Sequence, residues 1–161
     1  MIHLTFNADS TRLASSSWDR RVGLWDVPNR QSIRFFQGHQ GPVNAAEFHP
    51  TQPRLYSAGG DGHIRLWNLD TGEYVRSIIK NGFGINVMAL SAELNVLAYG
   101  GSNGVMKSVS LDESGPAIDL WVGGPPVLAI AIEPQSEKMA FGTAEGRVVI
   151  ADALVGEIQH D

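Results

Sequence analysis

The chain of 161 residues contains no cysteine. It therefore has no disulfide, no thiolate nucleophile and no cysteine metal site. The sequence also lacks an excess of basic residues, since 12 Lys and Arg stand against 17 Asp and Glu, a net charge of −5. A broad surface for nucleic acid or for an anionic membrane needs clustered Lys and Arg, so the charge argues against both partners.

Long hydrophobic runs are absent as well. The amino-terminal residues MIHLTFNADSTR lack the unbroken apolar core of a signal peptide, and no run approaches membrane-spanning length. These absences predict a cytoplasmic or nuclear location. The five histidines, at positions 3, 39, 49, 63 and 160, show no metal-ligand spacing, and no glycine-rich loop carries the lysine of a phosphate site. We therefore expect neither a metal nor a cofactor.

What the sequence does have is a repeat with a period of 42 residues, clearest over residues 38–72. A shift by this period places Asp61 on Asp19, Asn103 and Glu145. The same shift places Trp67 on Trp25, Val109 and Ala151. A fixed period in the low forties, built from short strands, is typical of a propeller blade.

Short strands and turn residues alternate through each copy. In the second copy the pattern predicts strands over residues 43–48, 54–58, 63–67 and 73–78. The first copy gives 4–6, 13–16, 22–25 and 32–36, and the fourth gives 127–132, 138–142 and 147–151. No helical periodicity interrupts them. The sequence therefore predicts an all-β fold of four blades, each with four antiparallel strands, in a single segment with blades at about 1–37, 38–79, 80–122 and 123–161.

The sequence of the second copy resembles that of the WD-repeat β-propeller family. It reads Gly-His at residues 38–39, Ser-Ala-Gly-Gly-Asp at 57–61 and Leu-Trp-Asn at 66–68. Four copies, two well formed and two degenerate, span residues 1–161. The resemblance implies a buried, hydrogen-bonded tetrad that ties the blade together, here His39, Ser57, Asp61 and Trp67. In the first copy the corresponding positions are Ser15, Asp19 and Trp25.

A serine, a histidine and an aspartate together also suggest a hydrolase. A nucleophilic serine should be exposed beside an oxyanion hole. Ser57 instead lies in the middle of a predicted strand, with Trp67 expected to donate to its oxygen. The sequence therefore favours a structural role for this group, and the chain is predicted not to be an enzyme. A hydrolase built on a propeller remains the alternative.

In the later copies, the residues at the tetrad positions are replaced together. Trp67 is replaced by Val109 and Ala151, and Ser57 by Tyr99 and Phe141. Losing a single partner would leave a buried polar group without a hydrogen bond, which costs about 1–3 kcal/mol of stability. Replacing all the partners together avoids this cost. We therefore interpret copies three and four as blades held by packing. A different domain after residue 80 is the alternative, and the unchanged register argues against it.

The resemblance implies a non-catalytic interaction scaffold that binds peptide or protein partners on a rim of loops. The candidate binding residues on this rim are Trp18, Arg20, Arg21 and His63. Trp18 is the strongest of them, because small residues occupy its place in the other copies: Gly60, Ser102 and Ala144. The adjacent arginines favour an acidic or phosphorylated partner. The alternative is that Trp18 only covers a loop of the neighbouring blade.

Family members usually close a ring with about seven blades, within the usual range for propellers. Four blades therefore predict an incomplete ring with two open ends. The sequence has no Gly-His loop before Met1 and stops at Asp161, inside an expected outer strand. We expect either the remaining blades of a longer propeller or self-association through the open ends. In the first case the chain could be a structural segment with no partner of its own.

Overall fold

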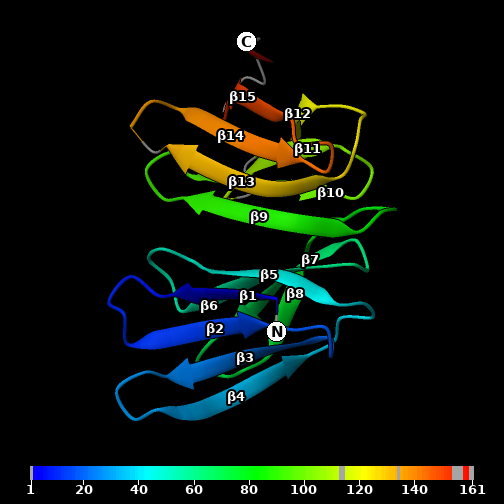
Figure 1. Cartoon of the computed structure of the whole chain (residues 1–161). Helices are drawn as coiled ribbons and strands as arrows, with labels where there is room; N and C mark the ends of the chain where they lie inside the picture. Colours follow the sequence, from blue (N-terminus) through cyan, green and yellow to red (C-terminus); the bar gives the residue numbers. More distant parts are fainter. Residues whose placement is uncertain (1, 113–114, 134, 154–157, 160–161) are drawn as a thin grey trace. The chain divides into compact units, whose positions relative to one another are not determined.

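The computed structural model describes residues 2–112, 115–133, 135–153 and 158–159. Every element in these residues is a strand, and the strands form four antiparallel sheets of four strands each (Figure 1). No helix in the described part of the chain is long and apolar enough to cross a membrane. The predicted all-β fold with four-stranded blades is therefore confirmed.

The strands of each blade follow one another in chain order. Blade one holds β1 (His3–Phe6), β2 (Arg12–Ser16), β3 (Arg21–Asp26) and β4 (Gln31–Gln37). Blade two holds β5 (Val43–Phe48), β6 (Arg54–Gly59), β7 (His63–Asn68) and β8 (Tyr74–Lys80). Blade three holds β9 (Ile85–Ser91), β10 (Val96–Gly101), β11 (Met106–Ser110) and β12 (Ile118–Trp121). Blade four holds β13 (Val127–Glu133), β14 (Lys138–Thr143), β15 (Val148–Asp152) and β16 (Ile158–Gln159).

The repeat is visible in the strand register. Leu13 on β2 faces Trp25 on β3, and one period later Leu55 on β6 faces Trp67 on β7. The strand bounds differ from the predicted ones by no more than two residues. The expected early stop of the last outer strand concerns residues 160–161, which lie outside the described residues.

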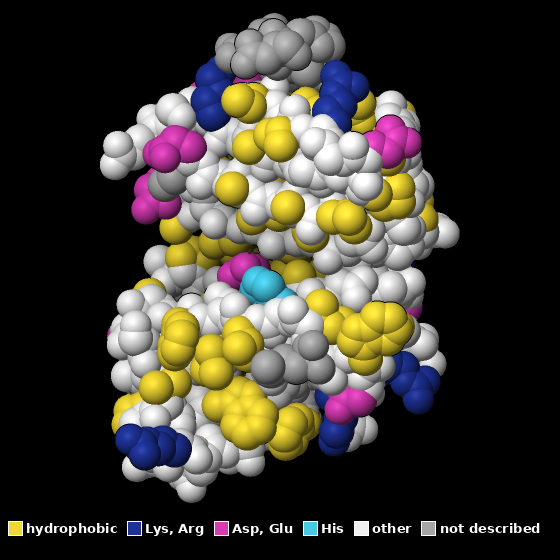
Figure 2. Space-filling view, viewed as in Figure 1, with side chains coloured by type: hydrophobic (Ala, Val, Ile, Leu, Met, Phe, Trp, Pro, Cys, Tyr) yellow, Lys and Arg dark blue, Asp and Glu magenta, His cyan; other side chains and the backbone are white. Residues whose placement is uncertain are grey.

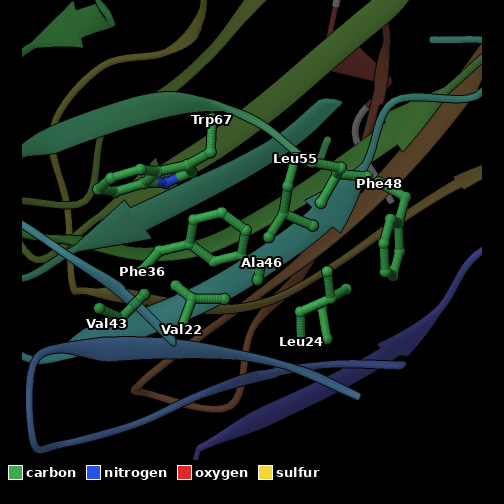
Figure 3. Packing of buried hydrophobic residues seen from close by; sticks show 10 residues of the cluster. Val22, Leu24, Phe36, Val43, Ala46, Phe48, Leu55 and Trp67 are labelled. Carbon is green, nitrogen blue, oxygen red and sulfur yellow. The ribbon is translucent and has the colours of Figure 1, made fainter. Parts of the chain in front are cut away.

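The chain divides into two compact units, residues 1–85 and residues 86–161. In the first unit, β1, β2 and β3 of blade one contact β5 of blade two. Apolar side chains from both sheets bury one another there (Figure 3). The labelled members of this core are Val22, Leu24, Phe36, Val43, Ala46, Phe48, Leu55 and Trp67. Apolar burial between sheets thus holds the first two blades together.

The second unit has its own core, to which blades three and four both contribute. Met106 and Leu120 of blade three belong to it, as do Met139 and Phe141 of blade four. Tyr99 and Phe141 occupy the position of Ser57 in the repeat and are almost fully buried. After residue 80 the chain therefore continues as blades rather than as a different domain.

Candidate functional site

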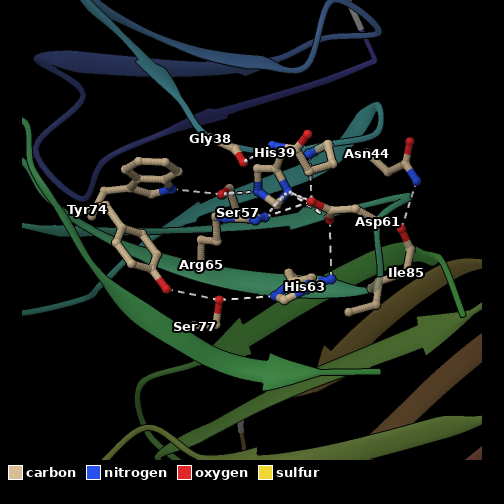
Figure 4. Close-up of polar contacts among 12 residues, drawn as sticks. Gly38, His39, Asn44, Ser57, Asp61, His63, Arg65, Tyr74, Ser77 and Ile85 are labelled. Atoms are coloured by element: carbon tan, nitrogen blue, oxygen red, sulfur yellow. Dashed lines mark hydrogen bonds and ion pairs between the residues drawn. The ribbon is translucent and has the colours of Figure 1, made fainter. Parts of the chain in front are cut away.

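A chain of polar contacts links four side chains of blade two (Figure 4). Trp67 on β7 donates its indole N–H to Ser57 Oγ on β6, at 2.8 Å. Ser57 Oγ also lies 2.8 Å from His39 Nε2, and His39 Nδ1 lies 2.9 Å from Asp61 Oδ1. His39 belongs to the loop that enters β5, and Asp61 to the turn between β6 and β7. The structure thus brings His39, Ser57, Asp61 and Trp67 together.

The partners of His39 define its protonation state. Burial lowers the pKa of His39, although hydrogen bonding to Asp61 acts in the opposite direction. A neutral imidazole with its hydrogen on Nδ1 donates to Asp61 and accepts the Ser57 hydroxyl hydrogen at Nε2. Because Trp67 only donates, the hydrogen bonds then run in one direction, from Trp67 through Ser57 and His39 to the carboxylate. Each of these four side chains has a hydrogen-bond partner in this arrangement.

Arg65 is a fifth member of this network that the sequence reasoning missed. Its Nη1 lies 2.7 Å from Asp61 Oδ2, which also accepts the backbone N–H of Gln40 at 2.8 Å. Burial alone would raise the pKa of Asp61, but the hydrogen bonds from Gln40, His39 and Arg65 outweigh it and hold the pKa well below its usual range. The sequence did contain a signal for this contact. Arg65 is a charged residue two positions before Trp67, and residues two apart lie on the same face of a strand.

Blade one repeats only part of this arrangement. Trp25 donates to Ser15 Oγ at 2.9 Å, as Trp67 does to Ser57. Asp19, expected in the same group, is exposed and accepts from Arg21 Nε at 2.9 Å and Nη2 at 2.6 Å. No histidine of the described residues bonds to Ser15 or Asp19. The structure therefore brings Ser15 and Trp25 together and leaves Asp19 in a surface ion pair.

The four predicted binding residues do not form one cluster. Trp18 and Arg20 lie exposed in the turn between β2 and β3, and the Trp18 side chain is 74% exposed. The Arg21 guanidinium binds Asp19 and lies over the Phe35 ring, 5.1 Å from its centroid. His63 belongs to blade two, is half-buried, and its Nδ1 lies 3.1 Å from Ser77 Oγ. Among the described residues, the side chains of Trp18 and Arg20 have no such contact.

The turn that carries Trp18 has the same backbone in every blade. Its last residue has a positive φ each time, 71°, 77°, 74° and 81° at Arg20, Gly62, Gly104 and Gly146. An L-residue in the left-handed region costs roughly 1–2 kcal/mol, which glycine avoids. Only blade one places a side chain there.

The surface shows no broad charged region on the face seen in Figure 2. Lys and Arg side chains are scattered there among acidic and hydrophobic ones. Among the described residues, no group of three or more His, Asp or Glu is placed to hold a metal ion. The chemistry offered by the blade-one turn is therefore that of an exposed indole beside a guanidinium.

Two comparisons with known proteins bear on this arrangement. The family model for the WD domain, G-beta repeat, matches residues 2–26 and 30–68. A guanine nucleotide-binding protein subunit beta-like protein of Encephalitozoon cuniculi is 24% identical over 91% of this chain and 51% of its own length. A WD repeat-containing protein WDS homolog of Arabidopsis thaliana is 26% identical over 95% of this chain and 31% of its own.

A shorter match has higher identity. The human WD repeat and HMG-box DNA-binding protein 1 is 37% identical over 67 residues, which are 42% of this chain and 6% of that protein. The chain thus spans about half or less of the length of the relatives it matches.

Proposed function

Because this chain belongs to the WD-repeat family, we propose that it acts as a non-catalytic scaffold which binds protein or peptide partners on a rim of loops. WD-repeat proteins generally mediate protein interactions. Loops held by a rigid framework are where recognition residues concentrate. The observation that carries the proposal is the turn between β2 and β3, where Trp18 is 74% exposed.

The backbone of this turn supports a role in binding. Arg20 holds a φ of +71°, where the other three blades have glycine. A strained residue that glycine could replace is unexpected if the turn serves only to fold. Trp18 likewise stands where the other blades have small residues. Trp and Arg are both among the residue types enriched at interface hot spots.

The partner that this turn favours is an acidic or phosphorylated peptide segment. Arg20 is exposed and has no ion pair within the described part of the chain, so it can pair with a carboxylate or phosphate, which arginine binds well. The Arg21 guanidinium is already engaged by Asp19, so it serves mainly to shape the turn. His63 is held by Ser77 and contributes less than the blade-one residues.

The experiment is to measure binding to a library of acidic and phosphorylated peptides with the wild-type chain and with Trp18→Ala. We expect peptides that bind the wild type to lose about 2 kcal/mol or more of binding free energy in the variant. Thermal unfolding should hardly change, because the Trp18 side chain buries little surface. A variant that unfolds more readily would make Trp18 a packing residue, and the proposal would fail.

The geometry around Ser57 supports a scaffold rather than a hydrolase. Ser57 is fully buried, and its oxygen already lies between Trp67 Nε1 and His39 Nε2. A nucleophilic serine needs an open approach for the substrate carbonyl. We expect no ester or peptide hydrolysis that depends on Ser57. Turnover lost in a folded Ser57→Ala variant would overturn this.

The relatives also bear on how the blades are completed. Since the chain spans about half or less of their length, we propose that its blades associate with further blades of a longer propeller or with a second copy. A cytoplasmic or nuclear location stays part of this proposal.

A further inference from the structure

An open pocket of about 400 Å³ lies along the two outer strands of blade two. Its lining residues from β7 and β8 are His63, Arg65, Trp67, Tyr74, Ser77 and Lys80. Gln37, at the end of β4 in blade one, and the adjacent Gly38 also line it. The pocket therefore includes residues of two neighbouring blades, both within the first unit.

The pairing of β7 with β8 gathers these side chains on one face. They form three cross-strand pairs: Trp67 with Tyr74, Arg65 with Ser77, and His63 with Lys80. The β7 members are two residues apart and the β8 members three, because the register shifts twice between the pairs. In a regular strand, residues three apart point to opposite faces. Each shift adds one residue to β8, as a β-bulge does, and so returns the next pocket residue to the same face.

The basic side chains of the pocket keep hydrogen-bond donors in reserve. Arg65 Nη1 lies 2.7 Å from Asp61 Oδ2, while Arg65 Nε and Nη2 have no acceptor among the described residues. Lys80 is exposed and has no ion pair in the described part of the chain. Of the described residues that line the pocket, none is Asp or Glu. The pocket is therefore suited to an anion.

A third donor follows from the hydroxyl groups beside the arginine. Ser77 Oγ lies 3.1 Å from the Tyr74 hydroxyl and 3.1 Å from His63 Nδ1 (Figure 4). When Tyr74 donates to Ser77 and Ser77 donates to Nδ1, the hydrogen of a neutral imidazole is on Nε2. This Nε2 has no acceptor among the described residues, so His63 can donate to a ligand.

Blade three supplies an anion at the corresponding place from its own strand. Lys107 stands where the repeat has Arg65, and Asp119 faces it as Ser77 faces Arg65. Lys107 Nζ lies 2.7 Å from Asp119 Oδ1. Blade two has a hydroxyl in place of this carboxylate. An anion at this place in blade two therefore has to come from outside the blade.

We propose that the pocket binds a phosphate monoester on a side chain of the partner. Nε–H and Nη2–H of Arg65 donate to two of its oxygens in parallel, and Lys80 and His63 donate to the third. Gly38 leaves the arginine uncovered, since a Cβ there would lie 3.9 Å from Arg65 Nε. The inference rests on the proposed function, because it assumes a phosphorylated partner, and it adds a site that does not include Trp18.

The test is an NMR titration of the full chain with three probes: phenyl phosphate, O-phosphoserine and inorganic phosphate. We expect the two monoesters to shift the Arg65 Nε–H and the backbone amides of Ser77 and Lys80 saturably, and to bind more tightly than inorganic phosphate. Lys80→Ala should weaken binding about fivefold. Arg20→Ala is the matched control, because it removes the same charge from the blade-one turn, and it should leave this affinity unchanged.

Ser77→Asp tests the comparison with blade three. Its carboxylate should pair with Arg65, as Asp119 pairs with Lys107, and abolish binding of the monoesters. Ser77→Asn differs from it only in charge and should keep most of the affinity. Thermal unfolding of the variants, recorded alongside, should show that they remain folded.

Several results would overturn the inference. Probes that leave the three signals unshifted, or equal loss in Ser77→Asp and Ser77→Asn, would reject an anion site here. Inorganic phosphate that binds as tightly as the monoesters would reject a phosphorylated partner as its ligand. Binding weakened by Arg20→Ala and not by Lys80→Ala would place the phosphate at the turn. Trp18→Ala separates the two proposals, because unchanged monoester binding in this variant retains the pocket even if the turn binds nothing.

Discussion

At the scale of single residues, Asp61 has more bonds than any other side chain of the blade-two network. It accepts from the His39 imidazole, the Arg65 guanidinium and the Gln40 backbone N–H. The Arg65 and Asp61 side chains are 11% and 7% exposed. A buried charge pair is costly to break from one side, because the remaining partner is left uncompensated.

We therefore predict that Asp61→Ala lowers the free energy of unfolding by about 3 kcal/mol. Asn103→Ala is the matched control at the equivalent turn of blade three. Asn103 is exposed, and among the described residues its side chain accepts only the backbone N–H of Val105, at 3.2 Å. Removing the Asn103 side chain should therefore lower the free energy of unfolding by clearly less. Denaturant unfolding of the two variants compares them, and equal losses would reject the network as the stability centre of the blade.

Glu47 on β5 provides a prediction about pH. Burial raises the pKa of Glu47 from 4.5 to about 7, although a hydrogen bond from Thr5 Oγ1 at 3.1 Å lowers it. The other titratable group facing it is His3, whose Nε2 lies 3.9 Å away. A raised carboxyl pKa means that the folded state favours the protonated form. Its stabilising contribution is complete below pH 4.5 and is lost as the pH rises to about 7.

Glu47→Gln should remove this pH dependence. We expect the variant to gain about 3 kcal/mol of stability relative to the wild type between pH 4 and pH 8, with most of the change between 4.5 and 7. Unfolding by denaturant at several pH values measures the difference. A difference between the two proteins that stays constant with pH would show that Glu47 ionises normally.

At the scale of structural elements, the turn between the second and third strands of each blade is the most regular feature. Its last residue has a φ between +71° and +81° in all four blades. In blade two this residue also packs tightly. A Cβ on Gly62 would clash with the Asn81 carbonyl oxygen and lie 2.8 Å from that of Phe83. Around Gly146 the same Cβ meets nothing within 4 Å.

This contrast predicts different costs for the same substitution. Gly146→Ala should lower the stability only by the cost of a positive φ in an L-residue, about 1–2 kcal/mol. Gly62→Ala should lose clearly more, because two backbone carbonyls must also move. Thermal unfolding of both variants provides the comparison. If the two lose the same stability, the close approach at Gly62 does not constrain the turn.

The repeat allowed most of the elements to be predicted from the sequence, because a strand and its turn residues recur every 42 residues. Membership of the networks was less predictable. Asp19 occupies the tetrad position, yet without an imidazole beside it the carboxylate pairs with Arg21. Arg65 enters the network through its guanidinium, whose Nη1 lies 2.7 Å from Asp61 Oδ2. Such contacts depend on side-chain geometry that the alternation of residue types does not encode.

At the scale of the whole molecule, each unit leaves apolar side chains exposed on a strand of an end blade. In blade one, Leu4 and Phe6 of β1 are exposed. In blade four, Leu128 of β13 and Val148 and Ile150 of β15 are exposed. Exposed apolar side chains that gather into a patch usually mark an interaction site. These strands are the surfaces through which we propose that further blades or a second copy associate.

The isolated chain should therefore associate with itself. We expect a sedimentation mass above the 17.4 kDa of the monomer. Leu4→Lys combined with Leu128→Lys should reduce it to the monomer, because charges oppose edge and face association. A wild-type monomer that unfolds cooperatively and binds no hydrophobic dye would contradict this proposal.

We propose above all that the blade-one turn is built for binding rather than for folding. Trp18→Gly with Arg20→Gly converts residues 17–20 from Ser-Trp-Asp-Arg to Ser-Gly-Asp-Gly, close to Gly-Gly-Asp-Gly in blade two. The decisive measurement is the affinity of this double variant for a peptide that binds the wild type, with its unfolding recorded alongside. We expect binding to be lost while the free energy of unfolding is unchanged or rises by up to about 1 kcal/mol, from relief of strain at position 20. Retained binding with reduced stability would contradict it.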